Sequence, residues 1–93
     1  MNNISEKKLE EGRSEALFLV NKLKENVNDL KSVRELSKIV SKDLEMNDDF
    51  WTEISTLDFT KIKFFPVRSL LAGILENKQD NSSISNIYNY LVV

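Results

Sequence analysis

The chain has 93 residues, a formal net charge of −2 at pH 7, and neither Cys nor His. This length predicts a single domain over residues 1–93, because compact domains contain roughly 50 to 250 residues. The lack of Cys excludes disulfides, thiolate nucleophiles and thiolate zinc sites, and the lack of His removes the commonest general base and transition-metal ligand. We therefore predict a protein that is not an enzyme and needs no metal or other cofactor.

The charges are distributed unevenly. Residues 43–58 contain no basic residue and six acidic ones, namely Asp43, Glu45, Asp48, Asp49, Glu53 and Asp58. The net charge is too small to predict nucleic-acid binding, which depends on a basic surface. No apolar run approaches the roughly 20 residues of a membrane span, and the charged first twenty residues predict no secretory signal. We expect a cytoplasmic protein without a transmembrane segment.

Two helices are predicted in the first half of the chain. Residues 5–29 carry an apolar stripe whose spacing suits packing against neighbouring helices, formed by Leu9, Ala16, Val20, Leu23, Val27 and Leu30. Residues 32–46 form a second amphipathic segment, and Ser32 and Glu35 at its start fit a capping box. The short connection between these segments predicts an antiparallel hairpin.

Residues 48–64 are the most ambiguous part of the sequence. Asn47 or Asp48 can cap a helix that starts here, and Phe50, Trp51 and Ile54 have helical spacing. Residues 60–64 instead alternate between polar and apolar, which is typical of a strand. The segment fits a bent helix, two short helices or a strand. Because a single strand would have no partner, we favour a helix with a break near residue 58.

The remaining sequence predicts two more helical segments. Pro66 suits the first turn of a helix, where its missing N–H has no cost, and apolar residues follow at helical spacing from Val67 to Leu75. After a polar turn, residues 84–91 predict a short terminal helix, capped by Asn81, Ser82 or Ser83. The fold class predicted is all-α, an antiparallel four-helix bundle, with a broken third helix as the open alternative.

Few residues could carry chemistry. Asp48 and Asp49, with Glu45 nearby, could bind a hard cation, but a calcium loop would also need a Gly that is absent here. Helix capping and solvation are the simpler explanation. No Ser lies in a nucleophile elbow, and no Gly-rich loop is present that could bind a phosphate.

Two regions of the second half could bind a partner. Aromatic and basic residues are mixed between residues 59 and 68, and the segment 84–93 is apolar and aromatic throughout. The first region could stack single-stranded nucleic acid, contact anionic lipid, or form a core hinge with exposed lysines. The second could dock on the bundle or bind a partner. We predict a partner-binding surface of aromatic and basic side chains, made of Lys61, Lys63, Arg68, Tyr88 and Tyr90.

About half of the chain resembles the bacteriocin immunity proteins of the enterocin A and pediocin-like class. The similar segments are Arg13-Ser14-Glu15-Ala16-Leu17 to Leu30, Val33-Arg34-Glu35-Leu36 to Leu44, and Ser83-Ile84-Ser85-Asn86-Ile87-Tyr88, whereas residues 48–66 depart from the family's pattern. The resemblance implies a cytosolic four-helix bundle that protects its producer by recognising a bacteriocin on its receptor at the inner membrane face. The alternative is a phage- or plasmid-type regulator that binds another protein or nucleic acid.

Overall fold

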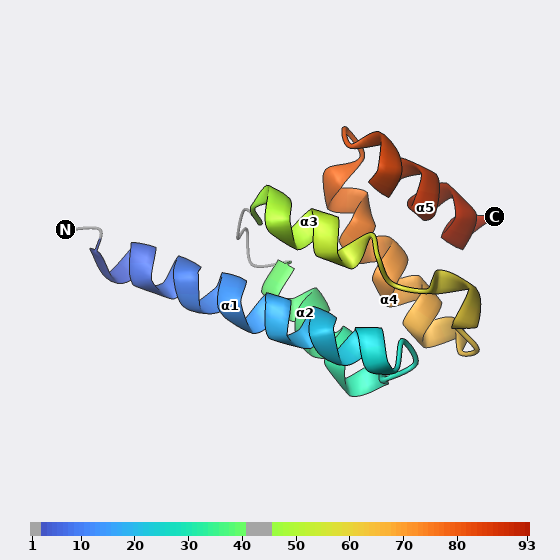
Figure 1. Cartoon of the computed structure of the whole chain (residues 1–93), viewed down its shortest axis with the longest axis horizontal. Coiled ribbons are helices and arrows are strands. Elements are labelled where there is room, and N and C mark those ends of the chain that lie inside the picture. Colours follow the sequence, from blue (N-terminus) through green and yellow to red (C-terminus); the bar gives the residue numbers. More distant parts are fainter. Residues whose placement is uncertain (1–2, 41–45) are drawn as a thin grey trace.

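The computed structural model describes residues 3–40 and 46–93, which form helices and connecting turns only (Figure 1). The elements are α1 (Asn3–Glu25), α2 (Leu30–Val40), α3 (Asp48–Ile54), the 3-10 turn η1 (Phe59–Lys61), α4 (Phe65–Leu75), the 3-10 turn η2 (Glu76–Lys78) and α5 (Ser82–Val92). The predicted all-α helical bundle is confirmed, and these residues contain five α-helices where the sequence predicted four. Each of the five helical segments described from the sequence overlaps one of these helices, and the broken third segment, which forms α3, is the helix beyond the four of the predicted bundle.

The helices pack in a chain of neighbours. α1 packs against α2 and α3, α2 packs against α4, and α4 packs against α5. The amino-terminal half of α1 extends beyond the other helices, at the opposite end of the molecule from the carboxyl end of α5 (Figure 1). No helix within the described residues has both the length and the apolar character needed to cross a bilayer.

One apolar cluster joins all five helices. It includes the predicted stripe from Ala16 to Leu23 in α1 and Val27 in the turn that follows, and its largest fully buried side chains are Phe50, Leu23, Leu36, Ile54, Leu71, Ile74, Leu75 and Ile84. The Phe50 and Trp51 rings meet edge to face, with centroids 4.8 Å apart. The burial of Leu9, which belongs to the same predicted stripe, lies outside the described side chains. The helical spacing therefore identifies the core face correctly wherever it can be compared.

The turn between α1 and α2 differs from the prediction. α2 begins at Leu30, and Asp29 rather than Ser32 caps it. The two Asp29 carboxylate oxygens accept hydrogen bonds from Ser32, at 3.3 Å from its backbone nitrogen and 2.8 Å from its hydroxyl. The capping box assigned to Ser32 and Glu35 is wrong, because a carboxylate three residues upstream satisfies the amide of residue 32 and the buried hydroxyl together. The predicted helical residues 41–45 lie outside the described part of the chain.

The predicted break near residue 58 is confirmed. Asn47 caps α3 by accepting from the Phe50 amide at 3.1 Å, and the helix ends at Ile54. The Ser55 and Thr56 hydroxyls then donate to carbonyls of the last turn, at 2.6 Å each. Asp58 opens η1 by accepting from the Thr60 amide at 3.1 Å. These local bonds stop the helix, and the strand alternative for residues 60–64 is wrong because residues 62–64 form no backbone ladder with another segment that the structure describes.

The last two helices start as the sequence indicates. Pro66 lies in the first turn of α4, and Asn81 caps α5 by accepting from the Ile84 amide at 3.2 Å. Ile84 and Leu91 are buried against the bundle, so the terminal segment docks. Tyr90 and Val92 remain about half exposed on the same helix.

We predict that Asp29→Ala lowers the free energy of unfolding by about 1 kcal/mol at pH 7, the usual effect of removing a helix cap. The Ser32 hydroxyl, and then the Ser32 amide, hold the pKa of the Asp29 carboxyl below its ordinary value of 3.8. A lowered pKa stabilises the fold above the unfolded pKa, about 3.9, and this contribution disappears as the pH falls through the folded pKa. Urea unfolding should therefore show the difference between the two proteins shrinking below about pH 4.

The matched control is Asp29→Asn, which keeps a capping oxygen but has no titrating carboxyl. We expect this variant to be more stable than Asp29→Ala at pH 7, because Asn is as good a cap as Asp. Equal stability of Asp29→Ala and the unchanged protein at pH 7 would contradict the assignment of Asp29 as the cap.

Candidate partner-binding surface

The five predicted binding residues do not form one contiguous group. Lys61 ends η1, Lys63 lies in the connection to α4, and Arg68 is in the first turns of α4. Tyr88 and Tyr90 lie in the second half of α5 but make different contacts. The half-buried Tyr88 packs on the core, and its hydroxyl lies 3.4 Å from a Glu76 carboxylate oxygen at the far end of α4. The structure therefore separates Tyr88 from the basic residues.

Arg68 fixes α5 to α4. Its Nε donates to the Leu91 carbonyl at 2.6 Å, and its Nη2 donates to the Tyr90 carbonyl at 2.9 Å. These carbonyls lie in the last turn of α5, where no further helical N–H is available to them, and a cation there also interacts favourably with the helix dipole. Because two of its nitrogens are bonded to α5, Arg68 positions this helix rather than presenting an unengaged charge.

The Tyr90 ring packs against the Arg68 guanidinium. The Arg68 guanidinium carbon lies 5.4 Å from the centre of the Tyr90 ring, within cation–π distance. The ring is on the surface, because 49% of the residue is exposed. Tyr90 is therefore an exposed aromatic side chain whose backbone and ring are both held by the same arginine.

Two grooves border α5. The larger, which we call the α4–α5 groove, has a volume of about 450 Å³ and is lined by Phe65, Arg68, Ser69, Ala72, Leu91, Val92 and Val93. The smaller and shallower one, the η1–α5 groove, measures about 350 Å³ and is lined by Ser55, Leu57, Asp58, Phe59, Thr60, Asn86, Ile87 and Tyr90. Arg68 lines the first groove and Tyr90 the second, so the Arg68–Tyr90 pair lies between them.

A side chain in the turn between α1 and α2 holds the connection from η1 to α4. Asn28, in the turn between α1 and α2, donates to the Lys61 carbonyl at 2.9 Å and accepts from the Lys63 amide at 2.8 Å. The side chains of Lys61 and Lys63 are both exposed. The Lys61 ammonium lies 3.8 Å from Asp58, but both groups are too exposed for this pair to be strong.

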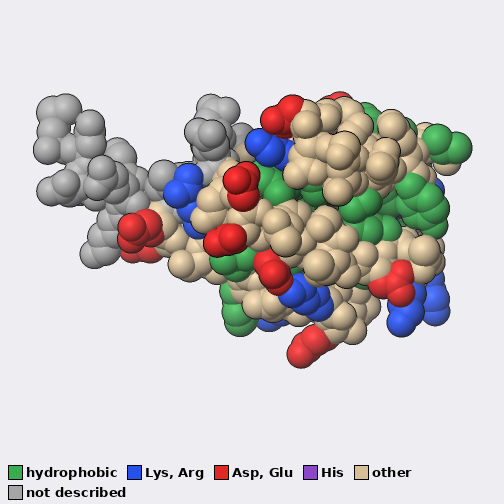
Figure 2. Space-filling view, turned by 45° about the horizontal axis from the view of Figure 1, so that its top comes forward, with side chains coloured by type: hydrophobic (Ala, Val, Ile, Leu, Met, Phe, Trp, Pro, Cys, Tyr) green, Lys and Arg blue, Asp and Glu red, His purple; other side chains and the backbone are tan. Residues whose placement is uncertain are grey.

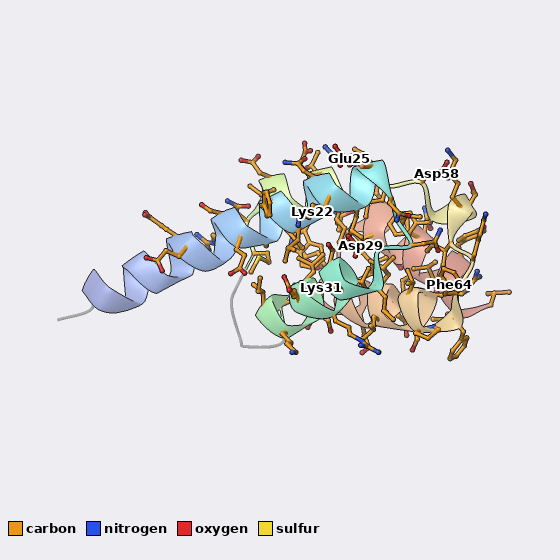
Figure 3. All side chains as sticks on the ribbon, turned by 90° about the horizontal axis from the view of Figure 1, so that it is seen from below. Lys22, Glu25, Asp29, Lys31, Asp58 and Phe64 are labelled. Atoms are coloured by element: carbon orange, nitrogen blue, oxygen red, sulfur yellow. The ribbon has the colours of Figure 1, made fainter. Side chains whose placement is uncertain are left out.

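The aromatic residues near these lysines divide into two kinds. Phe59 is buried in the core, whereas Phe64 and Phe65 are 55% and 78% exposed. Figure 3 shows Phe64 at the end of the molecule away from the amino terminus, pointing off the bundle. Of these three aromatic residues, only Phe59 fits the interpretation of this segment as a core hinge. Phe64 is extended and precedes α4, Phe65 is the first residue of that helix, and Pro66 follows in its first turn.

Two of the acidic residues considered for cation binding, Asp48 and Asp49, lie at the start of a helix. Asp48 and Asp49 lie exposed in the first turn of α3, where acidic side chains favour the positive end of the helix dipole. Across residues 10–40 and 46–93, whose side chains the structure describes, no three His, Cys, Asp or Glu residues are placed to share a metal ion. Glu45 lies outside these ranges.

Comparison with known proteins finds no matching protein family, no significantly similar curated protein and no significantly similar solved structure. The function has to be inferred from the surface of this chain.

We predict that Asn28→Ala releases the η1–α4 connection. The Lys63 amide should exchange with solvent faster, and the free energy of unfolding should fall by about 1 kcal/mol, because two hydrogen bonds are lost. Asn28→Asp keeps the acceptor for Lys63 and loses only the donor to Lys61, so its Lys63 amide should exchange more slowly than in Asn28→Ala. Amide hydrogen exchange followed by NMR measures both variants. Unchanged exchange of Lys63 in Asn28→Ala would contradict this role.

We predict that Arg68→Ala loosens the last turn of α5 and lowers the free energy of unfolding by about 1.5 kcal/mol, the scale of hydrogen bonds from a charged donor. Arg68→Lys keeps the charge but cannot bond both carbonyls. Its free energy of unfolding should therefore lie between those of Arg68→Ala and the unchanged protein. Lys63→Ala removes an exposed cation of the same region and should change stability by less than about 0.5 kcal/mol. Urea unfolding compares the three variants, and equal stabilities of Arg68→Ala and Lys63→Ala would refute the role of Arg68.

Proposed function

We propose that this protein is not catalytic and binds a protein partner through α5, with Tyr90 at the centre of the contact. The observation that carries the proposal is the position of Tyr90, half exposed between two grooves and held by Arg68. Tyr and Arg are enriched among the residues that dominate binding energy at protein interfaces. A side chain that is fixed before binding loses little conformational freedom on contact.

The surroundings of Tyr90 support a protein partner. Apolar side chains line both grooves, and Val92 is 53% exposed beside the larger one. Apolar side chains of a partner could fill the grooves while Tyr90 fits between them. The grooves combine apolar side chains with polar ones, Ser69 in the larger and Asn86 in the smaller, and protein interfaces likewise combine apolar and polar residues.

The specific function we propose is immunity to a pediocin-like bacteriocin. The protein would protect its producer by binding the bacteriocin–receptor complex at the inner membrane face. The resemblance of Ser83-Ile84-Ser85-Asn86-Ile87-Tyr88 to that family supports this, because the segment lies in the helix that carries Tyr90. The resemblance also implies that the carboxyl-terminal part sets specificity, and Tyr90 is the exposed aromatic side chain of α5.

A second candidate is a small phage- or plasmid-type regulator that binds nucleic acid. The exposure of Phe64 and Phe65 next to Lys61 and Lys63 favours it, since aromatic rings stack on bases and lysines contact phosphates. Salt-dependent binding of single-stranded DNA or RNA, lost in the double variant Lys61→Ala/Lys63→Ala, would support this candidate over immunity.

The test of immunity is to express the chain in a strain that is sensitive to pediocin-like bacteriocins. We expect the inhibitory concentration of at least one bacteriocin in a panel to rise. Tyr90→Ala should reduce that protection about tenfold or more, as expected for a dominant interface residue. Asn89→Ala, which alters an exposed neighbour on the same helix, should leave protection unchanged at equal protein abundance.

Absence of protection against every bacteriocin of the panel would overturn the immunity proposal. If Tyr90→Ala and Asn89→Ala protect equally well, the immunity proposal stands, but the assignment of the binding surface to Tyr90 is overturned. Circular dichroism of both variants shows whether the helical fold is retained, so that a loss of protection can be attributed to the contact.

A further inference from the structure

A projecting apolar and basic segment lies where the chain enters α4. We call it the aromatic tip and define it as Lys61, Lys63, Phe64 and Phe65. Phe64 and Phe65 are 55% and 78% exposed, although they are adjacent in the chain and among its largest apolar side chains. Figure 3 shows Phe64 directed away from the bundle, and Figure 2 shows hydrophobic surface together with Lys and Arg toward this end of the molecule. Such contiguous apolar exposure on a small protein commonly marks a contact site.

The backbone holds the tip in this exposed position. Asn28 bonds the Lys61 carbonyl and the Lys63 amide, and the Phe64 carbonyl accepts from the Arg68 amide at 3.1 Å. Phe64 is extended, and Pro66 follows in the first helical turn. These constraints act on both sides of the two phenylalanines. The rings therefore cannot turn into the core, where Phe59 already occupies the inward position, without breaking these bonds.

Basic residues are concentrated at the tip, and Asp58 is the acidic residue recorded beside them. Residues 59–75 contain Lys61, Lys63 and Arg68 and no Asp or Glu. Lys63 forms no ion pair in the described part of the chain, and Lys61 has only the exposed Asp58 at 3.8 Å. The acidic run at residues 43–58 precedes this segment. The tip thus combines two projecting aromatic rings with cations that lack a strong internal partner.

We propose that the aromatic tip docks on an anionic phospholipid membrane surface. Phe64 and Phe65 would enter the boundary between headgroups and acyl chains, and Lys61 and Lys63 would contact lipid phosphates. A fluid bilayer accommodates a convex apolar tip, and its negative surface potential complements the lysines. Nucleic acid fits less well, because it requires a continuous track of cations, whereas Arg68 is bonded to α5 and leaves Lys61 and Lys63 as the cations of the tip.

The contact is independent of the immunity proposal and is tested with purified full chain and lipid vesicles. We expect co-sedimentation with vesicles of phosphatidylcholine and phosphatidylglycerol, weak or absent co-sedimentation with pure phosphatidylcholine, and release in high salt. Phe64→Ala/Phe65→Ala should reduce partitioning about tenfold or more. Lys61→Ala/Lys63→Ala should reduce it by about fivefold for each lysine removed.

Phe18→Ala is the matched control. Phe18 is 58% exposed, close to the exposure of Phe64, and the Lys22 ammonium lies 5.0 Å from its ring centre. It therefore offers the same chemistry on α1, away from the tip, and its removal should leave vesicle binding unchanged. Circular dichroism should show the same helix content in all variants.

Three results would overturn the proposal. The first is no binding to anionic vesicles, and the second is an equal loss of binding in Phe18→Ala and Phe64→Ala/Phe65→Ala. The third is binding of single-stranded oligonucleotides through the tip without binding of vesicles, which would replace lipid by nucleic acid. Bacteriocin protection that persists without vesicle binding would overturn the membrane contact alone, whereas vesicle binding without any protection would overturn only the immunity proposal.

Discussion

Burial of one apolar face per helix in a shared core is the constraint on which this structure depends. A chain of 93 residues without Cys has no disulfide to restrict its unfolded state, and a chain of this size can bury only a limited fraction of its surface. Short helices such as α3 and α5 are marginal alone, so packing has to supply their stability. Ile54 and Ile84 are fully buried for this reason. With Ile84 and Leu91 buried against the bundle, α5 lies at its edge and Tyr90 is exposed on the surface.

Local polar side chains determine where the helices stop and therefore where the surface features lie. Asp29, Asn47, Asp58 and Asn81 each accept a backbone N–H at the start of a helix or 3-10 turn. Each such bond satisfies an amide that has no helical partner and sets the direction of the following element. The bond at Asp58 matters most for the surface, because it turns the chain before Phe59. Phe59 then enters the core while Phe64 and Phe65 leave it.

The features that could be predicted from the sequence are those fixed by neighbours along the chain. The spacing from Ala16 to Val27 identifies a core face, and Pro66 and Asn81 identify helix starts, because each depends on residues within one or two turns. The capping prediction at Ser32 failed because Asp29 and Ser32, three residues apart, can both cap a helix, and Asp29 is the cap in the structure. The bonds of Asn28 to residues 61 and 63, and of Arg68 to residues 90 and 91, join distant segments and have no local signal. The five residues proposed for the surface could therefore be chosen by residue type but not by arrangement, and Tyr88 contacts Glu76 rather than the basic residues with which it was grouped.

The two proposed contacts are mechanically connected through the start of α4. Arg68 lies one turn after Phe64, donates its amide to the Phe64 carbonyl, and holds the end of α5 with its guanidinium. Phe65 also lines the α4–α5 groove with Val92. A protein held on a membrane by the aromatic tip would therefore present Tyr90 and the α4–α5 groove close to the lipid surface. A partner bound there would have to be at the membrane itself, which is where a bacteriocin–receptor complex would expose its inner face. Because Phe65 belongs to both the aromatic tip and the α4–α5 groove, lipid and a partner that fills the groove would both contact this side chain.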